Sequence, residues 1–569
     1  MATPDAPSHE EPAGLALGRL GAGSVAFFGM AAAAPIATVV IVIPPVLAAG
    51  AGPLAALSVV AVAVVLVLFG TPYAAMIRRA PSAGGVYPQL ARGLGRPAAL
   101  TGAWLALAGY HAIQFGLYAL TAQAAAPLLL GWFGVTAPWW AVAAGCWAVV
   151  TLVGTVRIEV AAVVITILTV AEAAVLAGLA AANVVRPSGG RIETGTYWLG
   201  DLARIDRPLL GLLLAVAVLS FAGFETISTY AEESRDPRRT AGRAARLAVP
   251  AIALLLAGVT WSLIVAAGPR GVAGRAANRG PELLFALADE RLAGWAVTIG
   301  RVMLFTGLLA AILAVHHAIA RYLFALGRER VLPAVLGNVS ERTRAPRAAA
   351  LTQSLIAGAA LLGAAVAGAE ASARTARWLT VGGSLAVLVL LLLTAVAALL
   401  HLNRAPGGEG AWTRFFAPLL STVSLGVLVY LAGLNLPALL DVRSGSPWVT
   451  VVAAALAACP VIGLGHALVL RATHPVRYAA IGLGGAVLVV TPQRITPEKA
   501  PAAAPAPARG ENPWSWDTPP DASKDDIDDK SDKKTEPAPD EAQPAKIPQQ
   551  RAPGAHRPER VQPEVNADS

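Results

Sequence analysis

Long apolar runs separated by short polar segments fill the chain from Gly21 to Leu470. Most reach the length of about 20 residues that a helix needs to cross a bilayer. We therefore predict an all-α integral membrane protein with about twelve spans. The first five lie at 21–49, 53–76, 97–130, 138–155 and 160–184; the sixth opens at 208 and includes the segment 219–237. The seventh lies at 247–267, the eighth begins at 294 and runs into 316, and the last four lie at 348–368, 378–401, 415–434 and 448–470.

Two of these spans contain features that are costly in lipid. The sixth places a small-residue break and Glu225 near the depth of the bilayer midplane. A charge there is unfavourable by roughly 2.5 to 3.5 kcal/mol, and irregular backbone is tolerated only where protein or a water-filled cavity covers it. Glu225 therefore indicates a functional site.

The first span has a similar interruption, in which the alanine run from Ala31 is followed by Pro35. Proline suits the first turn of a helix, so Pro35 either starts a second half-helix or kinks a continuous one. A half-helix would direct amide groups and a partial positive charge at a carboxylate. Breaks in the first and sixth spans are typical of inverted-repeat transporters, whose site lies between them.

Composition and charge support a membrane protein, since 56% of residues are hydrophobic and only 14% are charged. From Gln493 onward there are 11 Lys and Arg against 15 Asp and Glu, leaving 33 against 20 in the body. Arginines cluster after the second span and at 235–246, which places those loops and the N-terminus in the cytoplasm and the protein in the cell membrane. No pattern indicates a nucleic-acid partner; membrane lipid and a small molecule are the expected partners.

Three motifs carry a resemblance to a known family. Phe221-Ala-Gly-Phe-Glu225, followed by Ala231-Glu-Glu233, resembles the sixth span of amino acid permeases in the amino acid-polyamine-organocation superfamily. The segment 81–87 resembles the Gly-Gly-x-Tyr loop after their second span, and 316–333 resembles the block after their eighth. The resemblance covers about 15–470 and implies a five-plus-five inverted repeat with broken helices 1 and 6, working by alternating access.

The resemblance also implies a substrate site. In the family, amide groups of the first break bind a substrate carboxylate, carbonyl groups of the sixth break bind its ammonium group, and an aromatic residue there closes the site. On this chain the implied backbone positions are Ala32, Ala33, Ala34 and Pro35 in the first break and Ser220, Phe221, Ala222 and Gly223 in the sixth, with Phe221 or Phe224 as the gate. Many relatives have glycines where this chain has Ala31 to Ala34, which leaves the identity of the substrate open.

The third span carries a polar stripe of Tyr110, Gln114 and Tyr118, spaced four residues apart on one helix face. Gln114 either lines a substrate cavity or makes a hydrogen bond between helices.

The remaining candidate residues are those that would couple transport to the movement of an ion. Sodium-coupled relatives use hydroxyl groups of the eighth span, but no Ser or Thr occurs from Gly307 to Arg321. Other relatives are thought to use a lysine in the fifth span, whereas the first lysine here is Lys499 and Glu172 lies near that position. The groups at membrane depth that can change charge are Glu172, Glu225, His316 and His317. We predict proton-coupled symport or exchange, with Glu225 as the coupling residue; a structural Glu225 bonded to backbone is the alternative.

The predicted organisation is a cytoplasmic N-terminus at 1–20, a transporter domain at 21–470, an interfacial or re-entrant segment at 471–492 and a disordered tail at 493–569. A thirteenth span at 478–490 is the alternative for the third of these, although this apolar run of about 13 residues is shorter than a span needs. The sequence shows no hydrolytic site, phosphate-binding loop or metal-ligand spacing, so we expect neither an enzyme nor a cofactor. The preferred function is a secondary transporter of amino acids or related amines. A non-transporting membrane sensor or scaffold is the alternative.

Overall fold

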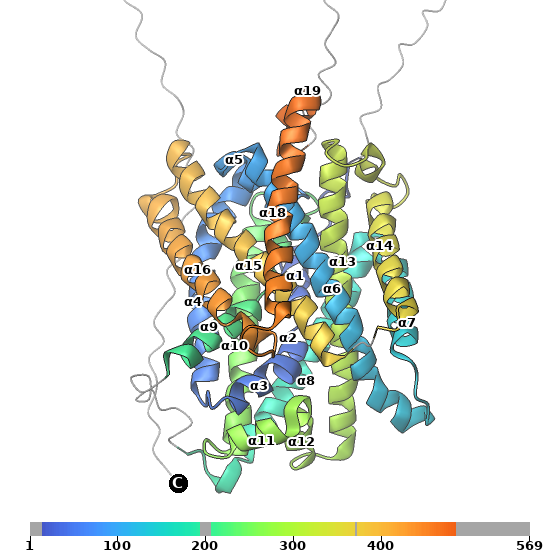
Figure 1. The fold of residues 1–569 in the computed structure, drawn as a ribbon, viewed down its shortest axis with the longest axis vertical. Coiled ribbons are helices and arrows are strands. Elements are labelled where there is room, and N and C mark those ends of the chain that lie inside the picture. Colours follow the sequence, from blue (N-terminus) through green and yellow to red (C-terminus); the bar gives the residue numbers. More distant parts are fainter. Residues whose placement is uncertain (1–13, 194–205, 370–371, 485–569) are drawn as a thin grey trace, which may run out of the picture. The chain divides into compact units, whose positions relative to one another are not determined.

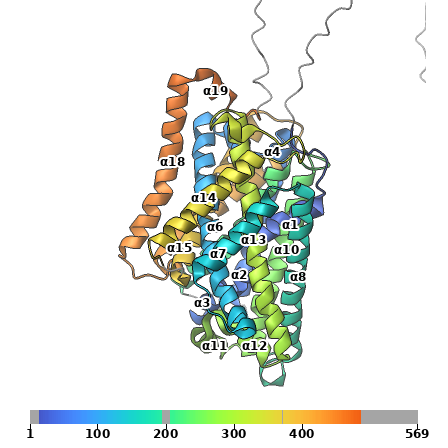
Figure 2. The same cartoon turned by 90° about the vertical axis from the view of Figure 1, so that its right-hand side faces the viewer.

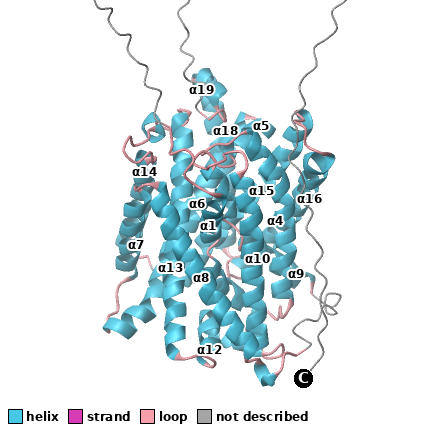
Figure 3. Cartoon of the chain, turned by 180° about the vertical axis from the view of Figure 1, so that it is seen from behind, coloured by secondary structure: helices cyan, strands magenta, loops and turns pink. Residues whose placement is uncertain are grey.

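The computed structural model describes residues 14–193, 206–369 and 372–484, and within them every regular element is a helix (Figures 1 and 3). Eleven of the described helical segments are long and apolar enough to cross a membrane. The remaining predicted span, the fourth, corresponds to α7 (Trp139–Gly154), which is apolar but has only 16 residues. The all-α membrane fold is therefore confirmed, while the predicted tail at 493–569 and most of the N-terminal segment lie outside the described residues.

Ten of the helices that match predicted spans are continuous. They are α4 (Leu54–Arg79), α6 (Arg96–Phe133), α7, α8 (Ile158–Val185), α10 (Thr240–Ala267), α13 (Gly294–Arg328), α14 (Arg347–Val366), α15 (Ala373–Arg404), α16 (Ala417–Leu434) and α18 (Pro447–Thr473). Most of them extend a few residues beyond the predicted limits, into the polar residues that flank the apolar runs.

The first span is broken where the sequence predicts. Helix α1 (Ala22–Ala32) ends before Ala33, and a second half begins at Pro35 as α2 (Pro35–Ala37), a π-helical turn η1 (Thr38–Val42) and α3 (Ile43–Ala48). Ala34 joins the halves with φ +47°, in the left-handed region. That conformation costs a residue with a Cβ roughly 1–2 kcal/mol, so surrounding contacts must hold it.

The sixth span is broken as well. Helix α9 (Arg207–Leu219) ends at the predicted small residues, and the chain continues as the 3₁₀ helix η5 (Phe224–Tyr230). Gly223 between them has φ +112°, which favours glycine. The two breaks are thus five spans apart, as the inverted-repeat architecture requires.

The broken first span lies in the centre of the bundle, where α1 packs against α8, α10, α13 and η5. A second group pairs α6 with α15, and α18 lies against the outer side of α6 (Figure 2). Most apolar side chains of α18 are exposed in the absence of a bilayer, including Val451, Val461 and Leu468. This is the pattern of a helix that faces lipid.

Short helices cover the two ends of the bundle (Figure 1). They are α5 (Tyr87–Gly93), η2 (Ser188–Gly190), α11 (Val272–Arg279), η6 (Gly280–Glu282), α12 (Leu283–Asp289), η7 (Ala334–Gly337), η8 (Trp412–Phe416), α17 (Leu436–Leu439) and α19 (Pro475–Ala480). The interfacial segment predicted at 471–492 is described only as far as Gly484, so it stays a prediction.

Candidate functional site

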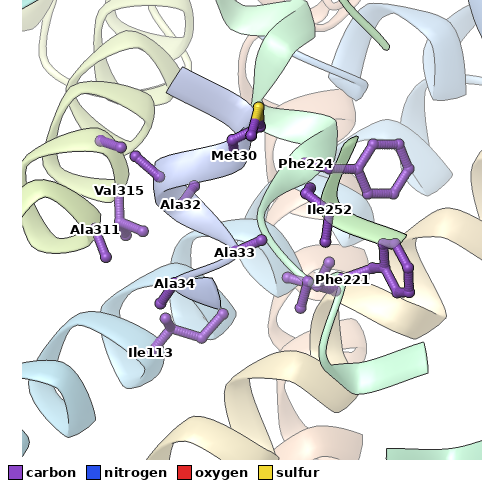
Figure 4. Close-up of a cluster of buried hydrophobic side chains, with 14 of the residues drawn as sticks. Met30, Ala32, Ala33, Ala34, Ile113, Phe221, Phe224, Ile252, Ala311 and Val315 are labelled. Carbon is purple, nitrogen blue, oxygen red and sulfur yellow. The ribbon is translucent and has the colours of Figure 1, made fainter. Parts of the chain in front are cut away.

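The two breaks touch each other in the centre of the protein. A Cβ atom built on Gly223 would lie 2.6 Å from both the carbonyl carbon and the carbonyl oxygen of Ala32. Figure 4 shows Ala32, Ala33 and Ala34 crossing this region, with Phe221 and Phe224 on the neighbouring segment of backbone. The absence of a side chain at Gly223 makes this close approach possible.

A cavity of about 570 Å³ opens beside the breaks. Its inner end is formed by Ala32, Ala33, Ala34, Ser220 and Ala222, and its walls by apolar side chains of η1, α6, α9 and α15. It extends to Asp441 and Arg443, which are exposed in the loop before α18. The volume and mainly apolar lining are those of a small-molecule site.

Three charged side chains mark the outer end of the cavity: Arg377, Asp441 and Arg443. Arg377 at the start of α15 pairs with Asp441 at 3.1 Å. The indole N–H of Trp378 donates to the carbonyl oxygen of Leu440 at 2.9 Å, which holds the loop against α15. Sequence reasoning missed this group, because charges at the ends of spans resemble ordinary loop residues.

Glu225 lies behind the sixth break with both carboxylate oxygens bonded. Tyr110 donates its hydroxyl to Oε1 at 2.8 Å, and the Gly223 amide donates to Oε2 at 3.0 Å. Tyr73 donates to the Glu225 carbonyl oxygen at 2.6 Å. Glu225 is 1% exposed and does not line the cavity. This arrangement matches the alternative in which Glu225 fixes the backbone of the break.

Glu172 of α8 lies behind the first break. Its Oε1 accepts a hydrogen bond from the Ile36 amide at 2.7 Å. Its Oε2 has no hydrogen-bond partner within the described residues and lies against Gly307 of α13, where a Cβ atom would be 2.7 Å away. Glu172 therefore touches both the start of the second half-helix and α13.

The amide groups of the first break already have partners. Ala33 donates to the Gly29 carbonyl at 3.3 Å and Ala34 to the Ala31 carbonyl at 2.9 Å. Pro35 has no N–H, and Ile36 donates to Glu172. A substrate carboxylate that binds here must therefore replace one of these acceptors.

The predicted gate residues point away from the cavity. In Figure 4 the rings of Phe221 and Phe224 extend away from the α1 break, and neither side chain lines the cavity. Phe224 instead packs edge-on against Phe69, with ring centroids 6.4 Å apart. A gating role would need these rings to rotate, and it stays a prediction.

Gln114 makes a hydrogen bond between helices and does not line the cavity, so its role in substrate binding stays a prediction. It accepts a hydrogen bond from Gln353 of α14 and is fully buried, whereas Ile113 and Leu117 of the same helix line the cavity. The polar stripe thus links helices, through Gln353 at Gln114 and through Glu225 at Tyr110.

The two histidines of α13 also lie outside the cavity. His316 packs against Gly154 of α7, where a Cβ atom would lie 2.2 Å from its Nε2. His317 contacts the ring of Phe28 edge-on at 5.9 Å, and its Nδ1 lies 3.2 Å from Nη1 of Arg321. Neither histidine contacts the cavity in this structure.

Parts of the three motifs meet at the opposite end of the bundle, which we call the arginine-rich face: Glu232 and Glu233 of the first motif, the segment 81–87, and the segment from Arg321 to Glu329. Helices α4 and α13 end at this face and α10 begins there. Arg321 donates to both oxygens of Glu233 at 2.6 and 3.0 Å, in a fully buried pair. Arg328 pairs with Glu232 at 2.6 Å, and Glu232 also accepts from the Ala83 amide at 2.9 Å.

Further contacts tie the segment before α1 and the segment after α19 to this face. The amides of Arg19 and Leu20 donate to the Glu233 carbonyl at 2.9 and 3.0 Å. Glu329 accepts from the Tyr87 hydroxyl at 2.5 Å and from the amides of Gly482 and Gly484 at 2.9 and 2.7 Å. The described structure is therefore closed at the arginine-rich face and hollow towards the other.

Two broken helices in a bundle of membrane-spanning length, with a cavity beside the breaks that reaches one face only, define the architecture of secondary transporters. Comparison with known families agrees: the model of the amino acid permease family matches residues 22–459. The chain belongs to the amino acid permease family.

The individual relatives are similar to only part of this chain. An uncharacterised transporter of Mycobacterium tuberculosis (strain ATCC 25618 / H37Rv) is 30% identical over 201 residues, 35% of this chain and 43% of that protein. The low-affinity putrescine importer PlaP of Escherichia coli (strain K12) is 26% identical, over 50% of this chain and 62% of its own. The vacuolar cationic amino acid transporter 4 of Arabidopsis thaliana is 28% identical, over 54% of this chain and 52% of that protein. The chain thus spans roughly half the length of these relatives.

Proposed function

We propose that this protein moves amino acids or related amines across the cell membrane by alternating access, with the cavity beside the breaks as the substrate site. The observation that carries the proposal is the asymmetry of the structure. The cavity reaches the surface at Asp441 and Arg443, while the buried Arg321–Glu233 pair closes the arginine-rich face. Alternating access requires that this state, open at one face, interconverts with a state that is open at the arginine-rich face and closed at the other.

The orientation follows from charge. Arginine-rich loops are retained in the cytoplasm, so the arginine-rich face is the cytoplasmic one in this proposal and the cavity opens outward. The described structure then corresponds to a carrier that accepts substrate from outside.

The proposal extends to coupling, for which we propose Glu172 rather than Glu225 as the residue that carries the proton. Both oxygens of Glu225 are bonded to donors, whereas Glu172 has one oxygen on the Ile36 amide and one unbonded within the described residues. Protonation of Glu172 would weaken its hold on Ile36 and free the start of the second half-helix. A proton taken up by Glu172 would thus be linked to movement of the first break against α8 and α13.

The test is uptake of radiolabelled amino acids and polyamines into proteoliposomes under imposed gradients. We expect uptake that an inside-alkaline pH gradient increases and a sodium gradient does not. Folded protein that binds one of these compounds but never moves it would support the sensor alternative. Sodium dependence without any response to the pH gradient would contradict proton coupling.

The Glu172→Gln variant should transport at a rate that no longer responds to the pH gradient, because the amide keeps an acceptor for Ile36 but cannot titrate. Glu225→Gln serves as the comparison: it should lower uptake equally with and without the gradient, since it disturbs the bonds to Tyr110 and Gly223. Both rates are measured in proteoliposomes of matched protein content. Full pH-driven uptake by Glu172→Gln would exclude Glu172 as the coupling residue.

A further inference from the structure

All charged side chains that line the cavity within the described residues lie at its outer end. They are Arg377, Asp441 and Arg443, with a net charge of +1. The one carboxylate among them is occupied, because Asp441 pairs with Arg377 at 3.1 Å. The outer end of the cavity, which we call the rim, therefore carries excess positive charge that an entering substrate meets.

The buried carboxylates nearest the breaks do not compensate for this charge. Glu172 and Glu225 are absent from the cavity wall and are each about 1% exposed. Glu172 accepts from the Ile36 amide, and Glu225 accepts from Tyr110 and Gly223. Because neither residue lines the cavity, neither carboxylate pairs with an ammonium group there.

The inner part of the cavity is apolar apart from a few hydroxyl groups. Its wall includes Ile41, Ile113, Leu117 and Val216, together with the hydroxyls of Thr38 and Ser384. A cation that enters such a space loses hydration without gaining an opposite charge, which is unfavourable. An apolar side chain gains free energy from the same surroundings.

From these observations we infer that the cavity selects neutral amino acids with apolar side chains and rejects diamines and cationic amino acids. The inference rests on the proposed transport function and narrows it. A neutral amino acid brings a carboxylate that the rim attracts and has no net charge, whereas a diamine brings two ammonium groups that the rim repels. The selectivity differs from what the names of the putrescine importer and the cationic amino acid transporter state for those relatives.

The experiment compares uptake of leucine, arginine and putrescine, each radiolabelled, into proteoliposomes at equal concentration and pH gradient. We expect leucine to enter at least tenfold faster than either cation. The Arg443→Glu variant changes the net charge of the lining from +1 to −1, and should raise the ratio of putrescine to leucine uptake several-fold. Arg374→Glu is the matched control, because Arg374 is exposed on the same helix as Arg377 but does not line the cavity.

The outcomes separate this inference from the proposed function. Putrescine or arginine uptake at or above the leucine rate would leave a working transporter and overturn the selectivity. An unchanged ratio in Arg443→Glu, or an equal change in Arg374→Glu, would overturn the role of the rim charge. Absence of uptake for every compound, with folded protein in the vesicles, would overturn the transport function and the inference with it.

Discussion

Replacing Gly223 with valine should abolish uptake while leaving much of the bundle folded. Gly223 has φ +112°, and any Cβ atom there would lie 2.6 Å from the carbonyl carbon and oxygen of Ala32. These are backbone atoms of the other break and cannot rotate away, so the two breaks must separate. The left-handed conformation adds roughly 1–2 kcal/mol of strain. We expect a loss of uptake of more than tenfold, measured in proteoliposomes.

Gly178→Val is the matched control for this prediction. Gly178 lies in α8, and a Cβ atom there would meet no heavy atom of another element within 4 Å, so valine should leave uptake within twofold of the wild type. If Gly223→Val yields no folded protein, Gly223→Ala, with the smallest Cβ, provides the second measurement. Wild-type uptake by the alanine and valine variants together would show that the breaks do not meet as described.

Breaking the buried pair at the arginine-rich face should produce the largest loss of stability. Arg321 and Glu233 are 2% and 1% exposed and share two hydrogen bonds. Removing one partner leaves an uncompensated buried charge, which costs about 3–5 kcal/mol. Glu233→Ala and Arg321→Ala should each lower the midpoint of thermal unfolding in detergent. The double variant Arg321→Met with Glu233→Leu should lower it less, because neither charge remains.

An exposed pair gives the control. Arg275 and Glu290 are 3.0 Å apart, with side chains 43% and 49% exposed. Such pairs contribute about 0–1 kcal/mol, so Arg275→Ala, which removes this pair and leaves the second contact of Glu290 with Arg291 in place, should leave the unfolding midpoint almost unchanged. Single variants of Arg321 or Glu233 that are as stable as Arg275→Ala would contradict the importance of the buried pair.

The sequence predicts the architecture well because its strongest signals are local. Apolar run length locates the spans, Pro35 marks the start of a half-helix, and Ser220 to Gly223 mark the second break; the structure has α2 begin at Pro35 and α9 end at Leu219. Each of these features follows from the chemistry of a few neighbouring residues. That the breaks approach each other follows from the repeat architecture.

The details of the site depend on neighbours that are distant in sequence. Periodicity places Gln114 on a polar face but does not name Gln353 as its partner. The rim charges Arg377 and Asp441 come from segments 64 residues apart in the numbering, and only the fold brings them to 3.1 Å. The direction of the Phe224 ring depends on packing against Phe69 of α4, which no sequence pattern reports.

The central claim is that substrate binds in the cavity beside the breaks, and cysteine labelling tests it most directly. The chain has two cysteines, Cys146 and Cys459, so alanine at both positions gives a background for Ser384→Cys on the cavity wall. A membrane-impermeant thiol reagent should label this cysteine, and a transported amino acid should slow the labelling. Ser444→Cys, exposed in the loop before α18 but outside the cavity lining, should be labelled at a rate that substrate leaves unchanged. Equal labelling of Ser384→Cys with and without a substrate that the protein transports would contradict the claim.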